Sequence, residues 1–201
     1  MLIEPVDEDP IRDFNDAEKI KLTHNLANLS RSIRRMDNKV SEYSVDIILI
    51  WHSQLFRDVR DHAGRFRSRD YGEEILIFGG HRSVHRNEVL AKIENHIKNF
   101  QNLISQLDNH QPKISPTIFV SEVIKVALFL HAEFIKIHPF RDGNGRVGRL
   151  IITFILSNYQ IPPLAFEVPK DEYINCLNKY YLTNDLDPLY KLSLRIYNNQ
   201  I

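Results

Sequence analysis

Residues 135–150, IKIHPFRDGNGRVGRL, bring several chemically versatile side chains together between two apolar runs. His138 is suited to take up a proton near neutral pH, because the ordinary pKa of imidazole lies close to that pH. Asp142 offers a hard carboxylate oxygen, which suits a magnesium ion that is shared with phosphate groups. Arg146 and Arg149 can each donate two parallel hydrogen bonds to phosphate oxygens. The stretch therefore predicts chemistry on a phosphate-bearing ligand.

The glycines of this stretch add a place for an anion. A helix that begins at 143–145 leaves its first N–H groups without intrahelical acceptors, and the positive end of its dipole faces the same way. Glycine also lets a ligand approach the backbone closely. The candidate ligand-binding residues are Gly143, Asn144, Gly145, Arg146 and Arg149; the candidate catalytic residues are His138, Asp142 and Arg146; and Asp142 is the candidate metal ligand. Together these groups suit the transfer of part of a nucleotide onto a hydroxyl group, with positioning and charge neutralisation supplying most of the rate.

The elements on either side must hold this stretch in place. Segments 117–137 and 150–159 are apolar on almost every face, which is typical of central helices. Apolar residues recur at helical spacing along most of the remaining chain. The expected helices cover residues 16–36, 44–63, 87–107, 117–137, 144–159, 170–182 and 187–197. The predicted fold class is therefore all-α, with the polar loop held from both sides at the end of the core.

Only residues 65–80, RFRSRDYGEEILIFGG, depart from the helical pattern. A turn candidate at 70–72 precedes the β-leaning run 75–78, which Gly79 and Gly80 close. We interpret 65–80 as a two-stranded hairpin that projects from a helical body. The expected organisation is an N-terminal arm and helix packed on the core over 1–40, with 1–12 extended, followed by one helical domain over 41–201.

Composition and charge exclude several functional classes. The 201 residues carry 26 Lys and Arg against 26 Asp and Glu, and this zero net charge gives no support for binding to nucleic acid or to an anionic membrane. One cysteine, Cys176, excludes an internal disulfide and fits a reducing cytoplasm. The acidic N-terminus does not resemble a secretory signal, and the apolar runs are shorter than the ~20 residues of a membrane span. We expect a soluble cytoplasmic protein, or one delivered to a host cell as an effector.

The polar loop carries a resemblance to a known family. HPFRDGNGR, residues 138–146, resembles the Fic motif His-x-Phe-x-Asp/Glu-Gly-Asn-Gly/Lys-Arg, and Arg149 matches a further downstream arginine of that family. HSQLFRDVRDHAGRFR (52–67) is similar to the helix and strand that precede the Fic flap, and ILIFGG (75–80) is similar to the flap. HAEFIKIHPF (131–140) resembles the run into the loop. The resemblance spans about residues 50–195.

The resemblance implies an all-helical Fic fold and the transfer of AMP from ATP to a Ser, Thr or Tyr hydroxyl of a target protein. It implies that His138 deprotonates the hydroxyl and that Asp142 holds Mg²⁺ on the phosphates. It also implies an anion hole at 143–145, with Arg146 and Arg149 on the β- and γ-phosphates. The flap, around 66–80, would bind the target by adding a strand. In the kinase-like Doc branch, Ala and Lys stand at the positions of Gly143 and Gly145, so the two glycines favour AMP transfer here.

Other interpretations of the loop remain open. The same pocket could transfer UMP, phosphate or phosphocholine, or could remove AMP, and a catalytically idle Fic-like adaptor is a further alternative. A glycine-rich turn with incidental charges is the simplest one, but it does not account for the register of His138 with Arg146. A calcium loop is excluded because Arg146 and Thr153 occupy positions that require an acid or amide and a glutamate.

Residues outside the loop have structural and functional interpretations. Tyr173 and Tyr180, seven apart on a late helix, could flank an adenine or pack in the core. His131 is expected to be a helix-face histidine that is bonded locally. The arginines of 57–69 alternate with acids, which favours a solvated face over a target-docking edge. His81 and His85 lack the glutamate of a HExxH zinc site, and Cys176 is expected to be a small buried hydrophobe.

An inhibitory motif found in many Fic proteins is missing from the sequence. That motif, Ser/Thr-x-x-x-Glu-Gly/Asn, supplies a glutamate to the second motif arginine. Here Glu94 precedes Asn95, but Leu90 stands where Ser or Thr is required, and near the C-terminus Tyr197 stands where Glu is required. We therefore expect that a separate antitoxin-like protein inhibits the enzyme, or that no such inhibition exists, in a bacterial toxin or effector.

Overall fold

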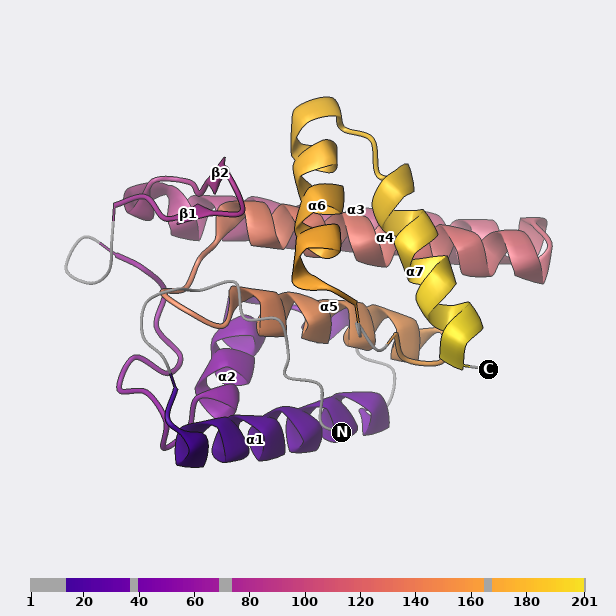
Figure 1. The fold of residues 1–201 in the computed structure, drawn as a ribbon. Helices are drawn as coiled ribbons and strands as arrows, with labels where there is room; N and C mark the ends of the chain where they lie inside the picture. The colour runs from indigo at the N-terminus through magenta and orange to yellow at the C-terminus, as the bar shows by residue number, and fades with distance from the viewer. Residues whose placement is uncertain (1–13, 37–39, 69–73, 165–167, 201) are drawn as a thin grey trace.

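The computed structural model describes residues 14–36, 40–68, 74–164 and 168–200, and it is mainly helical (Figure 1). The expected all-α class with a small hairpin is confirmed. The helices are α1 (Asp16–Arg35), α2 (Val45–Leu55), α3 (Val89–His110), α4 (Pro116–Ile137), α5 (Asn144–Asn158), α6 (Lys170–Thr183) and α7 (Asp187–Gln200). The strands are β1 (Ile77–Phe78) and β2 (His81–Arg82), and short 3₁₀ turns lie at Val40–Glu42, Arg86–Glu88 and Gln111–Lys113.

Local capping chemistry sets where several helices begin. Asn15 accepts a hydrogen bond from the Glu18 backbone N–H, and the Glu18 side chain accepts one from the Asn15 N–H, which makes a capping box at the start of α1. Ser44 caps α2 and Ser115 caps α4 in the same way with their hydroxyl oxygens. Capping residues of this kind can be recognised in the sequence, which is why the predicted start of α1 agrees with the structure.

Helix α2 is shorter than the sequence predicts. The expected helix over 44–63 ends at Leu55, and residues 57–64 form successive turns instead. Asp58 and Gly64 have positive φ angles of 60° and 76°, which a helix does not tolerate. The backbone N–H of Gly64 donates a 2.8 Å hydrogen bond to Nδ1 of His52, so the chain folds back onto α2. A tertiary contact has replaced the last two helical turns.

The hairpin also lies elsewhere than predicted. β1 and β2 pair antiparallel, with Ile77 opposite Arg82 and Phe78 opposite His81. Gly79 and Gly80 are therefore the hairpin turn, and their φ angles of 51° and 84° are those of a type I′ turn. The expected turn at 70–72 falls outside the described residues. We call residues 74–84 the flap.

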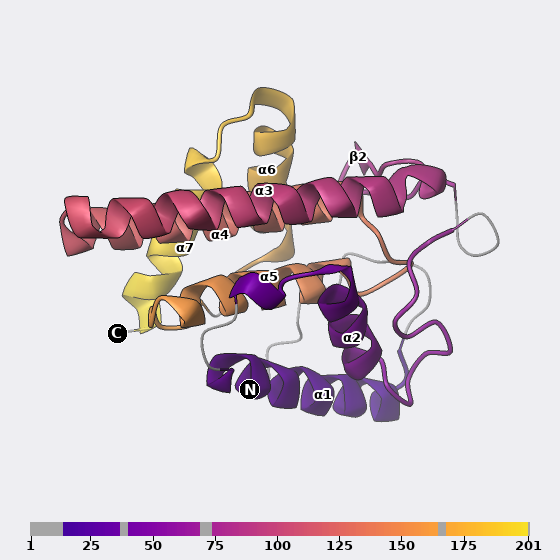
Figure 2. The ribbon, with the colours of Figure 1, turned by 180° about the vertical axis from the view of Figure 1, so that it is seen from behind.

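The helices pack around α5 (Figures 1 and 2). α4 packs along α5, and α3 lies on the outer side of α4. α1 covers another side of α5, with α2 between α1 and the upper helices, while α6 and α7 cross the pair on one face. Figure 1 shows the flap and the link between α4 and α5 at the same end of the molecule. Among the described residues, no helix is long and apolar enough to cross a membrane.

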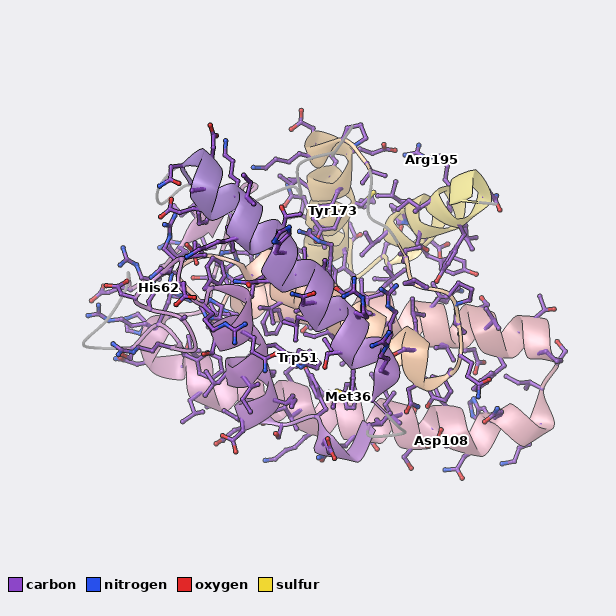
Figure 3. The ribbon with its side chains drawn as sticks, turned by 90° about the horizontal axis from the view of Figure 1, so that it is seen from below. Met36, Trp51, His62, Asp108, Tyr173 and Arg195 are labelled. Atoms are coloured by element: carbon purple, nitrogen blue, oxygen red, sulfur yellow. The ribbon has the colours of Figure 1, made fainter. Side chains whose placement is uncertain are left out.

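The core explains why α4 and α5 are apolar on nearly all sides. Half of the residues of α4, mainly in its second part, and most residues of α5 are buried, in agreement with the predicted central position. Trp51 of α2 (Figure 3) and Tyr43 pack on Phe154 of α5, and the rings of Tyr43 and Phe100 are stacked with centroids 4.1 Å apart. These aromatic contacts hold α2 against α5.

Candidate active site

The loop 138–143 joins two buried helices through two left-handed residues. α4 ends with His138 at φ 53° and ψ 60°, and α5 begins after Gly143 at φ 76°. A non-glycine residue in this conformation costs about 1–3 kcal/mol, which the surrounding structure must offset. At Gly143 a Cβ atom would lie 2.2 Å from Cε2 of Phe56, so only glycine fits between the loop and α2.

His138 is completely buried and is held through both its backbone and its ring. Its carbonyl oxygen accepts a 2.8 Å hydrogen bond from Nε of Arg67. Its ring stacks on Phe78 of β1, with centroids 3.9 Å apart and planes at 18°. Nδ1 lies 3.3 Å from the Ile135 carbonyl oxygen, which only accepts, so Nδ1 carries the proton in the neutral ring. Nε2 is then the basic nitrogen.

Asp142 is a buried carboxylate with two cationic or ionisable neighbours. Nε2 of His62 donates to Oδ1 at 2.9 Å, and Nε of Arg60 lies 3.4 Å from Oδ2. Burial raises the pKa of Asp142, but the hydrogen bond from His62 and the charges of His62 and Arg60 outweigh it, so this pKa lies below its usual range. Asp142 is therefore ionised at neutral pH. His62 lies at the end of the molecule where α1 begins (Figure 3).

His52 of α2 contacts the loop through its ring. Its Nδ1 accepts from Gly64, so Nε2 carries the proton and lies 3.3 Å from the Asp142 carbonyl oxygen, to which it donates. The ring stacks face to face on Phe140 at 3.8 Å and 4°. Burial, as the largest cause, lowers the pKa of His52 to about 3, so the ring stays neutral. The sequence placed His52 only in the helix before the flap and gave it no role.

Asn144 and Phe140 close the loop on itself. The Asn144 side chain accepts a 2.9 Å bond from the Phe140 N–H and donates a 3.0 Å bond to the Phe140 carbonyl. Phe140 is fully buried, so it anchors the loop in the core. The side chain of Asn144 thus holds the loop, and its backbone stands at the start of α5 beside Gly145.

The two motif arginines lie on the first turns of α5. Arg146 is buried, with its guanidinium 5.3 Å from the ring of Phe14 and 5.8 Å from the ring of Phe56. Arg149 follows one turn later and is half-buried. Between them, a Cβ on Gly148 would lie 2.8 Å from Nδ1 of His131, so α5 approaches α4 closely at that point.

The predicted solvated arginine face is only partly correct. Arg57 and Arg65 are exposed, and Arg69 lies outside the described residues. The side chain of Arg60 is buried. It pairs with Glu18 of α1 at 2.9 Å and with Asp142 at 3.4 Å. Arg67 is 1% exposed and bonds to the loop and to the flap. Two arginines of this run therefore belong to the site, because their partners come from distant segments.

Tyr173, Tyr180 and His131 lie in the interior. Tyr173 (Figure 3) and Tyr180 are both buried, which favours the core-packing interpretation over adenine contact. The Tyr173 hydroxyl lies 2.5 Å from Nε2 of His131, and the Tyr180 hydroxyl donates to Glu133 at 2.8 Å. The expectation that His131 is bonded locally is wrong, since Tyr173 is 42 residues away. Cys176 is half-buried rather than buried.

His81 and His85 have separate surroundings. The ring of His81 packs on Tyr181 at 4.4 Å, while Nδ1 of His85 accepts from the Asn87 N–H at 3.2 Å. Within the described residues, no group of three or more His, Cys, Asp or Glu side chains could hold a metal ion alone.

A hollow separates the flap from α6. It is lined by Phe78, Gly79, Lys170, Ile174, Leu177, Asn178 and Tyr181. Nδ2 of Asn178 donates to the Gly79 carbonyl at 2.5 Å, which ties the flap turn to α6. Because Phe78 also stacks on His138, the hollow lies next to the loop. No local sequence pattern indicates this hollow, since its walls come from segments about 90 residues apart.

Comparison with known proteins assigns the fold and the family. The Fic/DOC family model matches residues 42–156, and the chain belongs to this family. The structure is similar to a Fic domain containing signaling protein of Bacteroides thetaiotaomicron (TM-score 0.67, 17% identity, 92% of this chain and 72% of that one). It is also similar to the Bartonella tribocorum effector protein BepC with bound AMPPNP (TM-score 0.69, 15% identity, 90% and 86% covered).

Curated relatives match over shorter stretches. A Fido domain-containing protein of Dictyostelium discoideum is 43% identical over 70 residues, which cover 33% of this chain and 48% of that protein. A protein named probable protein adenylyltransferase, from Aquifex aeolicus, is 40% identical over 58 residues, 29% of this chain and 18% of that protein. The protein adenylyltransferase Fic of Aedes aegypti is 25% identical over 114 residues, 57% and 20% covered. The chain thus spans about half or less of the length of these relatives.

Proposed function

We propose that the chain transfers AMP from ATP to a Ser, Thr or Tyr hydroxyl of a target protein. The observation that carries the proposal is one short loop that holds the imidazole of His138, the ionised carboxylate of Asp142 and the N-terminus of α5. Relatives named protein adenylyltransferase support the same class of reaction.

His138 is the proposed base. With Nδ1 carrying the proton toward the Ile135 carbonyl, Nε2 is the nitrogen that would accept the hydroxyl proton of the target. The target oxygen then attacks the α-phosphorus of ATP. A bond forms between that oxygen and the phosphorus, the bond from the α-phosphorus to the α–β bridging oxygen breaks, and pyrophosphate leaves. His138 holds the proton at Nε2.

The start of α5 is the proposed phosphate site. The first backbone N–H groups of this 15-residue helix are directed toward the loop. Arg146 and Arg149 add positive charge on the same helix, one turn apart. These groups would stabilise the charge that develops on the departing pyrophosphate.

Asp142 is the proposed magnesium ligand, and the residues present fit that ion. Magnesium usually takes one or two protein carboxylates and completes its shell with phosphates and water. A single ionised carboxylate beside a phosphate site meets that requirement, whereas a cage of several acids is not needed. When bound, the ion would supply charge neutralisation on the phosphates. Arg60 and His62 hold the Asp142 carboxylate in place.

The hollow beside the flap is the proposed nucleobase site. It adjoins the loop through Phe78 and offers apolar walls with the polar group of Asn178, as small-molecule pockets commonly do. The flap is the proposed contact for the target, which would add an extended strand to it. Both assignments rest on the AMP-transfer proposal. Because the sequence lacks the inhibitory motif, we also propose that an antitoxin-like protein inhibits the enzyme, and that the enzyme acts as a toxin or effector in the cytoplasm or in a host cell.

The test is transfer of label from ATP to lysate proteins, with Mg²⁺ present. Label from the α-phosphate should appear on protein and should disappear in His138→Ala. Transfer of γ-label would indicate a kinase, and transfer only from UTP or another donor would indicate a different Fic reaction. No transfer, with partner proteins still captured by both wild type and His138→Ala, would indicate an adaptor. Intact mass after incubation with ATP and Mg²⁺ reports self-modification, which an internally inhibited enzyme would not show.

A further inference from the structure

Arg67 is a buried cation with several hydrogen bonds, and it joins two separate segments. Arg67 is 1% exposed, and it lies three residues after the turns that end at Gly64. Its guanidinium donates to the carbonyl oxygens of His138 (2.8 Å), Ile137 (3.5 Å), Glu74 (3.3 Å) and Val84 (3.1 Å), and to the hydroxyl of Ser83 (3.1 Å). The first two acceptors belong to the end of α4, and the other three belong to the flap.

On the α4 side, Arg67 fixes the backbone around His138. The Arg67 backbone N–H donates to the Pro139 carbonyl at 2.8 Å, so this one residue binds three consecutive carbonyls, from Ile137 to Pro139. These carbonyls belong to the peptide planes that flank the left-handed residue His138. Since a left-handed backbone is strained for a residue other than glycine, this conformation persists only where neighbouring bonds fix it. Arg67 supplies those bonds and thereby sets the direction of the imidazole.

On the flap side, Arg67 bonds to Ser83, the residue that connects the two sides of the hairpin. The Ser83 hydroxyl accepts from Leu76 N–H at 2.9 Å and donates to the Val84 carbonyl at 3.0 Å, while Ser83 N–H donates to the Leu76 carbonyl at 2.9 Å. Ser83 is therefore bonded at once to the opposite side of the flap and to Arg67. Only the planar fork of arginine, with five donors, can serve acceptors in two segments together.

We propose that Arg67 is a positioning residue that couples the flap to the loop, so that His138 keeps its active direction only while the flap is closed on it. The stacking of Phe78 on the His138 ring is the second contact between the same two segments. The catalytic consequence rests on the proposed function, in which His138 is the base and the flap holds the target. The coupling itself concerns only the chain and can be measured without substrate.

Hydrogen exchange of single amides, followed by NMR, tests the coupling. The reporters are the Leu76 and Ser83 amides of the flap and the His138 and Phe140 amides of the loop, all of which donate within the chain. In Arg67→Gln we expect both groups to exchange at least about tenfold faster, which corresponds to about 1.4 kcal/mol, because each group loses more than one hydrogen bond to the guanidinium. Amides in the middle of α3 should not change. The matched control is Arg65→Gln, since Arg65 is exposed two residues away.

Ser83→Ala tests the coupling from the flap side and keeps the proposal falsifiable if Arg67→Gln fails to fold. It removes a partner of Arg67 without touching α4. Faster exchange of the His138 and Phe140 amides in Ser83→Ala supports the coupling. Faster exchange confined to Leu76 and its flap neighbours overturns it.

The catalytic consequence is tested with Arg67→Lys in the labelled-ATP assay. We expect kcat to fall by tenfold or more while the KM for ATP changes less than twofold, because the phosphate site on α5 does not involve Arg67. Unchanged kcat with fast loop exchange overturns the catalytic part of the proposal. If the wild type transfers nothing, the proposed function fails, and the exchange results still decide whether Arg67 couples the two segments.

Discussion

Replacing Gly143 by alanine tests whether the loop is held as tightly as its geometry indicates. The new Cβ would lie 2.2 Å from Cε2 and 2.6 Å from Cζ of Phe56, and the backbone has φ 76°. The left-handed conformation costs an L-residue about 1–2 kcal/mol. Overpacking against a buried ring costs typically about 1–3 kcal/mol. Since alanine also restricts the unfolded chain by about 0.4–1 kcal/mol, we expect a net loss of about 2–4 kcal/mol in the free energy of unfolding.

Gly80→Ala is the matched control for this prediction. Gly80 also has a positive φ, of 84°, but its Cβ would meet only Nδ2 of Asn178 at 3.9 Å. It therefore carries the backbone cost without the overlap, and should lose only about 1 kcal/mol. Phe56→Leu removes the ring atoms in conflict, so Gly143→Ala should cost less in that background than in the wild type.

Urea unfolding at 25 °C, followed by circular dichroism, gives the free energies of the four proteins and the double variant. Transfer of α-label by Gly143→Ala should fall together with stability, because the shifted loop carries both His138 and Asp142. If Gly143→Ala costs no more than Gly80→Ala, or if the effects of Gly143→Ala and Phe56→Leu simply add, the close packing of the loop on α2 is refuted.

Three further predictions concern buried titratable and polar groups. Burial lowers the pKa of His131 to about 3, below its unfolded value near 6.5. The stability that the neutral ring contributes is therefore fully present above pH 6.5, and should fall by up to about 1.4 kcal/mol per pH unit below it. In thermal unfolding between pH 7 and 4.5, the stability of His131→Gln should depend less steeply on pH than that of the wild type. Tyr173→Phe should lose about 1–2 kcal/mol of stability in urea with an unchanged KM for ATP, and a tenfold higher KM would instead support adenine contact. Asp142→Asn should reduce transfer at least 100-fold and raise the Mg²⁺ concentration needed for half-maximal rate, unlike the exposed Asp61→Asn.

The sequence predicted the helices and the loop because their signals are local. Capping at Asn15, the apolar faces of 117–137 and 150–159, and the glycines of 143–145 each lie within a few residues of the structure that they determine. The same locality explains the resemblance to the Fic motif, which the family match then confirmed.

The errors came from contacts between segments far apart in the chain. The burial of Arg60 and Arg67 depends on acceptors in α1, the flap and the end of α4, and nothing beside these arginines in the sequence reveals such partners. The partner of His131 is 42 residues away. The end of α2 was misplaced because the Gly64 N–H bonds to His52 rather than continuing a helix. Polar residues in alternating-charge runs are therefore the hardest to assign without coordinates.

The contacts of Phe14 and Glu18 with Arg60 and Arg146 bear on where this domain begins. The matched region begins at residue 42, yet Phe14 lies against the guanidinium groups of Arg60 and Arg146, and Glu18 pairs with Arg60. A fragment cut at the boundary of the shared motif would leave these two cations facing solvent on one side. The region that the family model matches, residues 42–156, is thus smaller than the part of this chain that surrounds Arg60 and Arg146. A fragment that keeps these contacts has to include α1 and Phe14.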